Sequence, residues 1–138
     1  MRIMAIDYGD AHTGIAISDP TGLLAGFTTV INSRRQEVVV EQVKLLAKEH
    51  GAEELVLGHP VNMDGTLGPR SEKAKAMKVL LEEATALPVV LWDERRTTID
   101  AHNILFNSGK NAKQRKKVVD AVAASLILEG YLTFKKSH

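Results

Sequence analysis

The chain has 138 residues, no cysteine and a formal net charge of +1. This length favours a single domain, residues 1–138, with room for a hydrophobic core. Hydrophobic residues make up 44% and charged residues 25% of the sequence, as is typical of a soluble globular protein. No apolar run approaches the roughly 18 residues that span a bilayer. The lack of cysteine excludes disulfide chemistry and is compatible with the cytoplasm, where we expect the protein to act without contacting a membrane.

Two short apolar runs at the N-terminus predict a β-hairpin. The first run, residues 1–6, ends on Asp7, and the second, residues 15–17, is soon followed by Asp19. The turn between them contains glycine, as hairpin turns commonly do. A carboxylate at the end of an apolar strand lies close to the core and is costly unless it is paired or bound to a metal. Asp7 is therefore the first candidate for a functional residue.

The next elements are a third strand over residues 23–31 and a helix. The strand is rich in β-branched residues and would complete an antiparallel meander. Ser33 and Gln36 fit the capping-box pattern that begins a helix. We expect this helix to end at Gly51, because glycine easily adopts the left-handed conformation of a C-cap.

The rest of the chain alternates between strands and helices, which predicts an α/β fold. We expect strands at residues 55–57 and 89–92, and helices at residues 70–86, 97–106 and 114–134. The continuous apolarity of residues 55–57 indicates a strand that is buried on both faces, as in a parallel sheet. The element order predicts a mixed five-stranded sheet, with three antiparallel strands and then two parallel ones, and helices on both faces.

Carboxylates stand at three positions in this order. Asp7 ends the first strand, Asp93 and Glu94 end the last strand, and Asp120 lies in the final helix. Functional sites in α/β sheets gather at the carboxyl ends of the strands. Asp7 and the Asp93–Glu94 pair would therefore converge if their strands were parallel neighbours.

Asp120 shares one surface of the predicted final helix with Ala123 and Ala124. An aspartate on such an apolar face is desolvated, and it therefore needs a cation or hydrogen bonds. Two interpretations stay open at this point. Asp120 is either the third ligand of a metal cluster or the partner of Lys116 or Arg95 in a salt bridge.

A site of carboxylates without histidine or cysteine suits Mg²⁺ or Mn²⁺. Two such ions, roughly 3.5–4 Å apart, can clamp the attacking and leaving oxygens of a phosphodiester displacement. In this hypothesis Asp7 bridges both ions, Asp93 or Glu94 holds one, and Asp120 holds the other. The histidines show no metal-ligand spacing, and we interpret them as surface residues: His12, His50, His59 and His102.

Motifs along the whole chain resemble those of the YqgF family of RuvC-like proteins. The matching stretches are Asp7-Tyr8-Gly9, Gly58-His59-Pro60, Trp92-Asp93-Glu94-Arg95 and Lys116-Lys117-Val118-Val119-Asp120. The resemblance implies a ribonuclease H-like fold and a metal-dependent nuclease, acting either on the 5′ end of pre-16S rRNA or on Holliday junctions. Asp7 and Asp120 match the first-strand and last-helix acids of the family. The middle acid stays open between Asp93 and Glu94, with Glu94 preferred.

Basic residues gather just before Asp120, although the small net charge exerts no global attraction on nucleic acid. Five cations fall within eight residues: Lys110, Lys113, Arg115, Lys116 and Lys117. Beside a carboxylate cluster they would neutralise phosphates of nucleic acid. The alternative is a solvated helix start, but cations there oppose the helix dipole.

Two further arginines are candidates for phosphate contacts. Arg95 could hold the scissile phosphate or pair with Asp93, and Arg70 could contact phosphate at the end of the glycine-rich loop before it. The alternative for Arg70 is an ordinary turn.

The preferred hypothesis is a hydrolase of phosphodiester bonds that acts on structured RNA in ribosomal precursor particles, with branched DNA as the competing substrate. One rival is a nucleotide-dependent phosphotransferase, because Asp-x-Gly followed by Gly-x-Ala resembles the phosphate-binding hairpin of actin-like ATPases. That architecture needs two such domains, however. Another rival is an assembly factor that binds RNA without cutting it. The oligomeric state stays open, although a junction resolvase would be a two-fold dimer.

Overall fold

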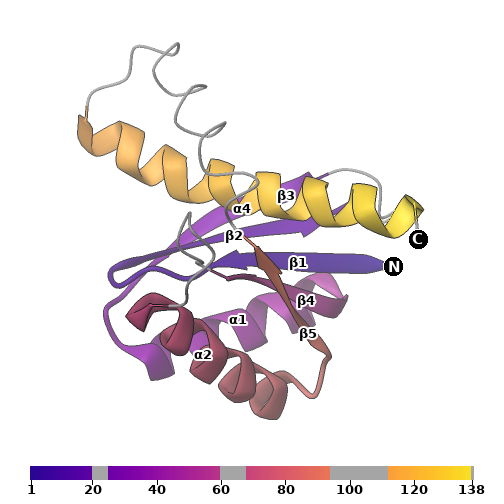
Figure 1. The fold of residues 1–138 in the computed structure, drawn as a ribbon, viewed down its shortest axis with the longest axis horizontal. Coiled ribbons are helices and arrows are strands. Elements are labelled where there is room, and N and C mark those ends of the chain that lie inside the picture. Colours follow the sequence, from indigo (N-terminus) through magenta and orange to yellow (C-terminus); the bar gives the residue numbers. More distant parts are fainter. Residues whose placement is uncertain (20–24, 60–67, 94–111, 138) are drawn as a thin grey trace.

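The computed structural model describes residues 1–19, 25–59, 68–93 and 112–137 (Figure 1). Within these ranges, the side chains of residues 25, 112–121, 136 and 137 are outside the description. Figure 1 shows a central sheet with a long helix on one face and the other described helices on the opposite face. None of the described helices combines the length and hydropathy of a membrane span.

The sheet has five strands in the order β3-β2-β1-β4-β5. Their bounds are β1 (Arg2–Asp7), β2 (His12–Ser18), β3 (Ala25–Asn32), β4 (Ala52–His59) and β5 (Val89–Asp93). The first three strands form an antiparallel meander, whereas β4 is parallel to β1 and β5 is parallel to β4. The predicted mixed sheet of three antiparallel and two parallel strands is confirmed.

Three helices are described: α1 (Gln36–His50), α2 (Pro69–Thr85) and α4 (Ala112–Ser137). The helix predicted over residues 97–106 lies outside the described residues. As predicted, α1 ends at Gly51, which is left-handed with φ 68° and donates its N–H to the carbonyl of Ala47.

The predicted capping box at the start of α1 is wrong. The N-cap is Arg35, and it makes no side-chain capping bond. The Ser33 hydroxyl instead accepts the N–H of Arg35 at 3.1 Å, a local bond that serine often makes in place of a cap. Ser33 also donates its own N–H to the carbonyl of Ala11. Ser33 is therefore still held beside the β1–β2 turn, and the helix begins after it.

Alternating residues of each strand divide the core into two layers, as the pleat of a sheet requires. One layer lies between the sheet and helices α1 and α2, and it contains side chains from both: Met4, Ile6, Ile15, Ile17, Leu55, Leu57, Val39, Val43, Met77 and Leu81. The other layer lies between the sheet and α4, and it contains side chains from both: Ile3, Ala5, Ala16, Val56, Ala124, Ile127 and Leu128. The alanines in the second layer bring α4 close to the sheet.

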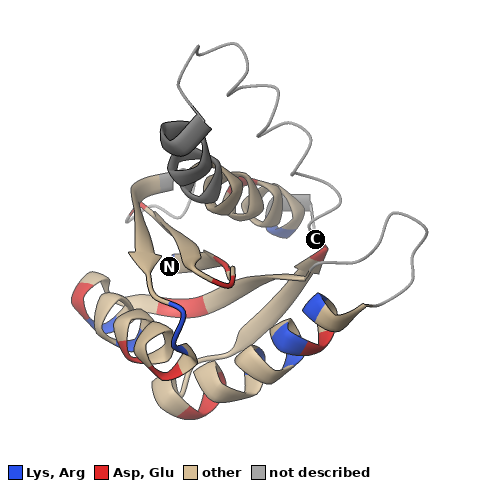
Figure 2. Cartoon of the chain, turned by 90° about the vertical axis from the view of Figure 1, so that its left-hand side faces the viewer, with Lys and Arg blue, Asp and Glu red and all other residues tan. Residues whose placement is uncertain are grey.

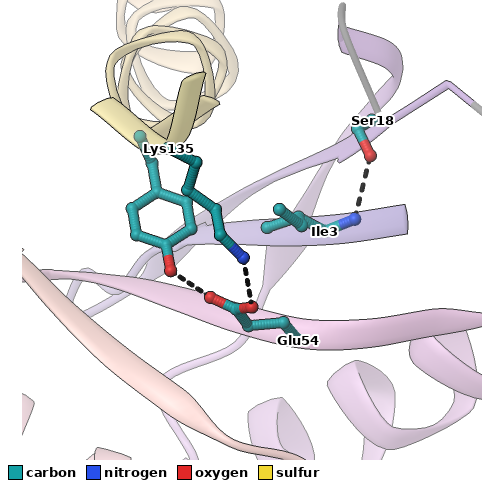
Figure 3. Close-up of polar contacts among 5 residues, drawn as sticks. Ile3, Ser18, Glu54 and Lys135 are labelled. Carbon is teal, nitrogen blue, oxygen red and sulfur yellow. Dashed lines mark hydrogen bonds and ion pairs between the residues drawn. The ribbon is translucent and has the colours of Figure 1, made fainter. Parts of the chain in front are cut away.

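A polar cluster holds the C-terminal half of α4 over the start of β4 (Figure 3). Glu54 is only 9% exposed, and its carboxylate accepts the Tyr131 hydroxyl and, at 3.0 Å, the Lys135 ammonium. Close by, Ser18 accepts the N–H of Ile3 at 2.8 Å. The C-terminal end of α4 thus lies near the amino ends of the parallel strands, and the helix runs back toward their carboxyl ends (Figure 1).

Candidate active site

The three parallel strands end at the same edge of the sheet, here called the carboxyl edge: Asp7 on β1, His59 on β4 and Asp93 on β5. Ile6 pairs with Leu57, and His59 pairs with Asp93, so Asp7 ends its strand one residue before His59 and Asp93 end theirs. Asp7 and Asp93 therefore share one edge, as expected. Their strands are not neighbours, however, because β4 lies between them. Two strand spacings separate the backbones by roughly 9–10 Å.

The pleat assigns these two acids to opposite faces of the sheet. Asp7 alternates in step with Ile3 and Ala5, which pack under α4. Asp93 alternates in step with Val89 and Leu91, which pack on the side of α1 and α2. Strand residues two apart point the same way. Asp7, half-buried at the end of β1, therefore belongs to the α4 face of the carboxyl edge.

Asp120 lies on α4, one turn before the buried residues Ala123 and Ala124. Its own side chain is not described. The helical rise puts Asp120 about 16 Å before Tyr131 along α4. Along β4, Gly58 lies about 13 Å beyond Glu54, which holds Tyr131. These lengths are comparable, and Figure 1 shows α4 running back over the sheet toward the carboxyl edge, so the α4 backbone that contains Asp120 lies on the same face as Asp7.

The remaining candidates fall partly outside the described residues. Glu94, Arg95 and Lys110 are among those that the structure does not describe. The backbone of the first turns of α4 carries the other basic residues, whose side chains are not described: Lys113, Arg115, Lys116 and Lys117. Arg70 is exposed on the first turn of α2 and lines a pocket beside Tyr8 and Gly9.

His59 lies at this edge and differs from the surface histidine that the sequence predicts. It is half-buried rather than on the surface, and its Nε2 lies 2.6 Å from the hydroxyl of Ser71. Ser71 is fully buried in the first turn of α2. This bond ties the end of β4 to the start of α2. The sequence gives no sign of it, because Ser71 lies in a separate element beyond an intervening loop.

Among the described residues, no group of three or more His, Cys, Asp or Glu side chains is placed to hold a metal ion. Of the three ligands predicted from the sequence, Asp7, Glu94 and Asp120, only the Asp7 side chain is described. The donor chemistry still fits a hard cation, since carboxylate oxygens are the ligands that Mg²⁺ and Mn²⁺ prefer.

Known sequences match this chain over nearly its whole length. A family model described as "RuvX: Holliday junction resolvase" matches residues 1–134. A protein of Halothermothrix orenii is 44% identical over 135 residues, which cover 98% of this chain and 96% of the relative. A protein of Listeria monocytogenes serotype 4b is 45% identical over 134 residues, covering 96% and 97%. Both bear the name "Putative pre-16S rRNA nuclease".

Comparison with solved structures confirms the RuvC-like fold. RuvC of Thermus thermophilus in complex with a Holliday junction matches with a TM-score of 0.65 at 14% identity, covering 99% of this chain and 96% of that one. A ROK hexokinase of the same organism matches with a TM-score of 0.52 at 23% identity, covering 75% and 38%. At such identities these likenesses concern the fold alone.

Proposed function

Since this chain belongs to the RuvX family, we propose that it is a cytoplasmic nuclease that hydrolyses phosphodiester bonds of pre-16S rRNA in ribosomal precursor particles. The names of relatives that match over almost their full length support this substrate. The observation that carries the proposal is the position of Asp7. It lies at the carboxyl edge of the sheet, on the face covered by α4, and α4 is the helix that contains Asp120.

The acid set that we propose is Asp7, Glu94 and Asp120. Asp93 alternates in step with Val89 and Leu91, on the side of the sheet away from α4. This parity favours Glu94 over Asp93 as the middle acid. Asp93 then contributes to the site indirectly, through its place at the end of β5.

Mg²⁺ or Mn²⁺, when held by these carboxylates, would supply a water nucleophile at neutral pH and stabilise the leaving oxygen. Asp7 would orient this centre from β1, the central strand of the sheet, which is paired on both sides. The basic residues would bind and position the backbone of the nucleic acid: Arg70, Arg95, Lys110, Lys113, Arg115, Lys116 and Lys117. We propose that the whole chain forms one ribonuclease H-like nuclease domain.

Resolution of Holliday junctions is the second candidate function. The description of the matching family model favours it. A resolvase acts on a substrate of near two-fold symmetry and would be a dimer.

The test is cleavage of labelled pre-16S rRNA and of a four-way DNA junction, with Mn²⁺ or with EDTA. We expect Mn²⁺-dependent cutting of the rRNA, lowered at least about 100-fold in Asp7→Asn, as for loss of a group that acts in the transition state. The control is Glu53→Gln, an exposed acid at the opposite end of β4, which should cut like the wild type. Cutting of the junction alone would favour the second candidate, and equal cutting by Asp7→Asn would overturn the proposed site.

A further inference from the structure

We propose that a pocket on the other face of the carboxyl edge binds a second, non-scissile backbone phosphate of the substrate. The pocket lies between the β1–β2 turn (residues 8–11) and the first turns of α2. We call it the α2 pocket, and its lining residues are Tyr8, Gly9, Asp10, Arg70, Lys73 and Ala74. This inference rests on the proposed function, and it adds a contact that would align the nucleic-acid strand with the site at Asp7.

The size of the α2 pocket suits a phosphate group. Its volume is about 80 Å³, whereas a single water needs at least about 10–15 Å³. Gly9 contributes only backbone to the lining, so a small anion can approach the β1–β2 turn closely. The pocket therefore has room for a compact group such as a phosphate.

Two cations reach this pocket from successive turns of α2, and Figure 2 shows basic residues on the first turns of this helix. Arg70 carries a planar guanidinium, which can hold two phosphate oxygens at once. Lys73 lies one turn further on. The helix itself adds a positive end, since α2 has 17 residues, begins after Gly68 and has no side-chain cap. An anion is the ligand that this arrangement favours.

In the structure, the carboxylate of Asp10 forms an ion pair with Lys73. The Lys73 ammonium lies 3.2 Å from the Asp10 carboxylate, with the two side chains 58% and 75% exposed. An ion pair so open to water is worth little, so a phosphate can replace the carboxylate at Lys73 at small cost. Asp10 therefore acts as a competitor that a bound strand displaces.

The position of the pocket relative to Asp7 decides which phosphate it takes. Tyr8 lines the pocket and directly follows Asp7, which belongs to the α4 face. The pocket opens on the side of α2, whose residues Ala74 and Met77 pack on the opposite face of the sheet. A strand that crosses the carboxyl edge would thus place one phosphate at Asp7 and another at Arg70 and Lys73.

The test is equilibrium binding of a labelled pre-16S rRNA fragment in EDTA, over a series of salt concentrations. We expect Lys73→Ala and Arg70→Ala each to weaken binding and to reduce the slope of log K against log[salt] by about 0.7–0.9, as for loss of one phosphate contact. Asp10→Asn should strengthen binding. The matched control is Lys78→Ala, since Lys78 pairs with Glu82 on the same helix at the same 3.2 Å, and it should leave the slope unchanged.

The outcomes separate this inference from the proposed function. Slopes in Lys73→Ala and Arg70→Ala equal to that of Lys78→Ala would overturn the phosphate site, even if the wild type cuts rRNA with Mn²⁺. Changed slopes without any Asp7-dependent cutting would keep the site and overturn the nuclease. If ATP binds and needs Lys73 while binding of the rRNA does not, the pocket takes a free nucleotide phosphate and the inference is wrong.

Discussion

At the scale of single residues, the proposed site depends on the face of the sheet to which each acid belongs. Asp7 follows the buried residue Ile6 and alternates with Ile3 and Ala5. Its carboxylate therefore lies at the margin of the core, where the proposed cation would offset the cost of desolvation. Asp93, the last residue of β5, alternates instead with Val89 and Leu91, so it does not share the face of Asp7.

A matched pair of variants tests this parity. We expect Glu94→Gln to lower the single-turnover rate of rRNA cleavage at least about 100-fold, and Asp93→Asn to keep most of it, because Asp93 alternates with Val89 and Leu91. Each variant removes one negative charge, and the two positions are adjacent in the sequence. The reverse order of effects would show that the alternation of β5 does not decide the ligand.

Two glycines offer a second test at this scale. Gly9→Ala should destabilise the fold by roughly 1–3 kcal/mol, because the new Cβ would lie 2.4 Å from a backbone carbonyl. Gly51→Ala should cost about 1 kcal/mol, since its φ is +68° but nothing lies within 4 Å of the new Cβ. Urea unfolding measures both. A smaller loss for Gly9→Ala than for Gly51→Ala would mean that the β1–β2 turn readily relaxes.

At the scale of elements, the placement of α4 along the sheet determines where Asp120 lies. The bond from the Tyr131 hydroxyl to Glu54 and the ion pair of Glu54 with Lys135 hold this helix to β4. Burial, and then the bond to Glu54, raise the pKa of the Tyr131 hydroxyl above its ordinary value of 10.0. Deprotonation of Tyr131 would leave two negative charges facing each other, so the contact persists only in its protonated form.

This contact predicts a specific loss of stability in alkali. The unfolded chain ionises Tyr131 near pH 10, whereas the folded chain keeps its proton, so the contribution of Tyr131 is complete below pH 10 and declines as the pH rises above it. We expect the free energy of unfolding of the wild type to fall between pH 10 and 11 by up to about 1 kcal/mol more than that of Tyr131→Phe. Parallel curves for the two proteins in urea would refute the coupling.

At the scale of the whole molecule, the sequence predicted most of the strands of the sheet but not which strands lie next to each other. The apolar runs and the turn residues are local signals, and they gave the strands, the end of α1 at Gly51 and the mixed topology. The insertion of β4 between β1 and β5 is a long-range pairing, which local patterns do not encode. The contact of Lys73 with Asp10 and the bond of His59 to Ser71 also join separate elements, and so they became visible only in the fold.

The fold does not determine the reaction, which depends on the residues of the active site. The same sheet matches RuvC and, over 75% of this chain, a hexokinase, so architecture alone does not choose between nuclease and kinase. The distinction lies in the residues of the carboxyl edge. There the chain places Asp7 beneath the helix that contains Asp120, and basic residues of α2 on the other side.

The most direct measurement is the anomalous diffraction of Mn²⁺ in crystals of the wild type and of Asp7→Asn. We expect a Mn²⁺ peak at the carboxyl edge on the α4 face, bound by Asp7 and Asp120, and its loss in the variant. A peak elsewhere in the wild type, or one that persists unchanged in Asp7→Asn, would contradict the assignment of Asp7 as the centre of the site.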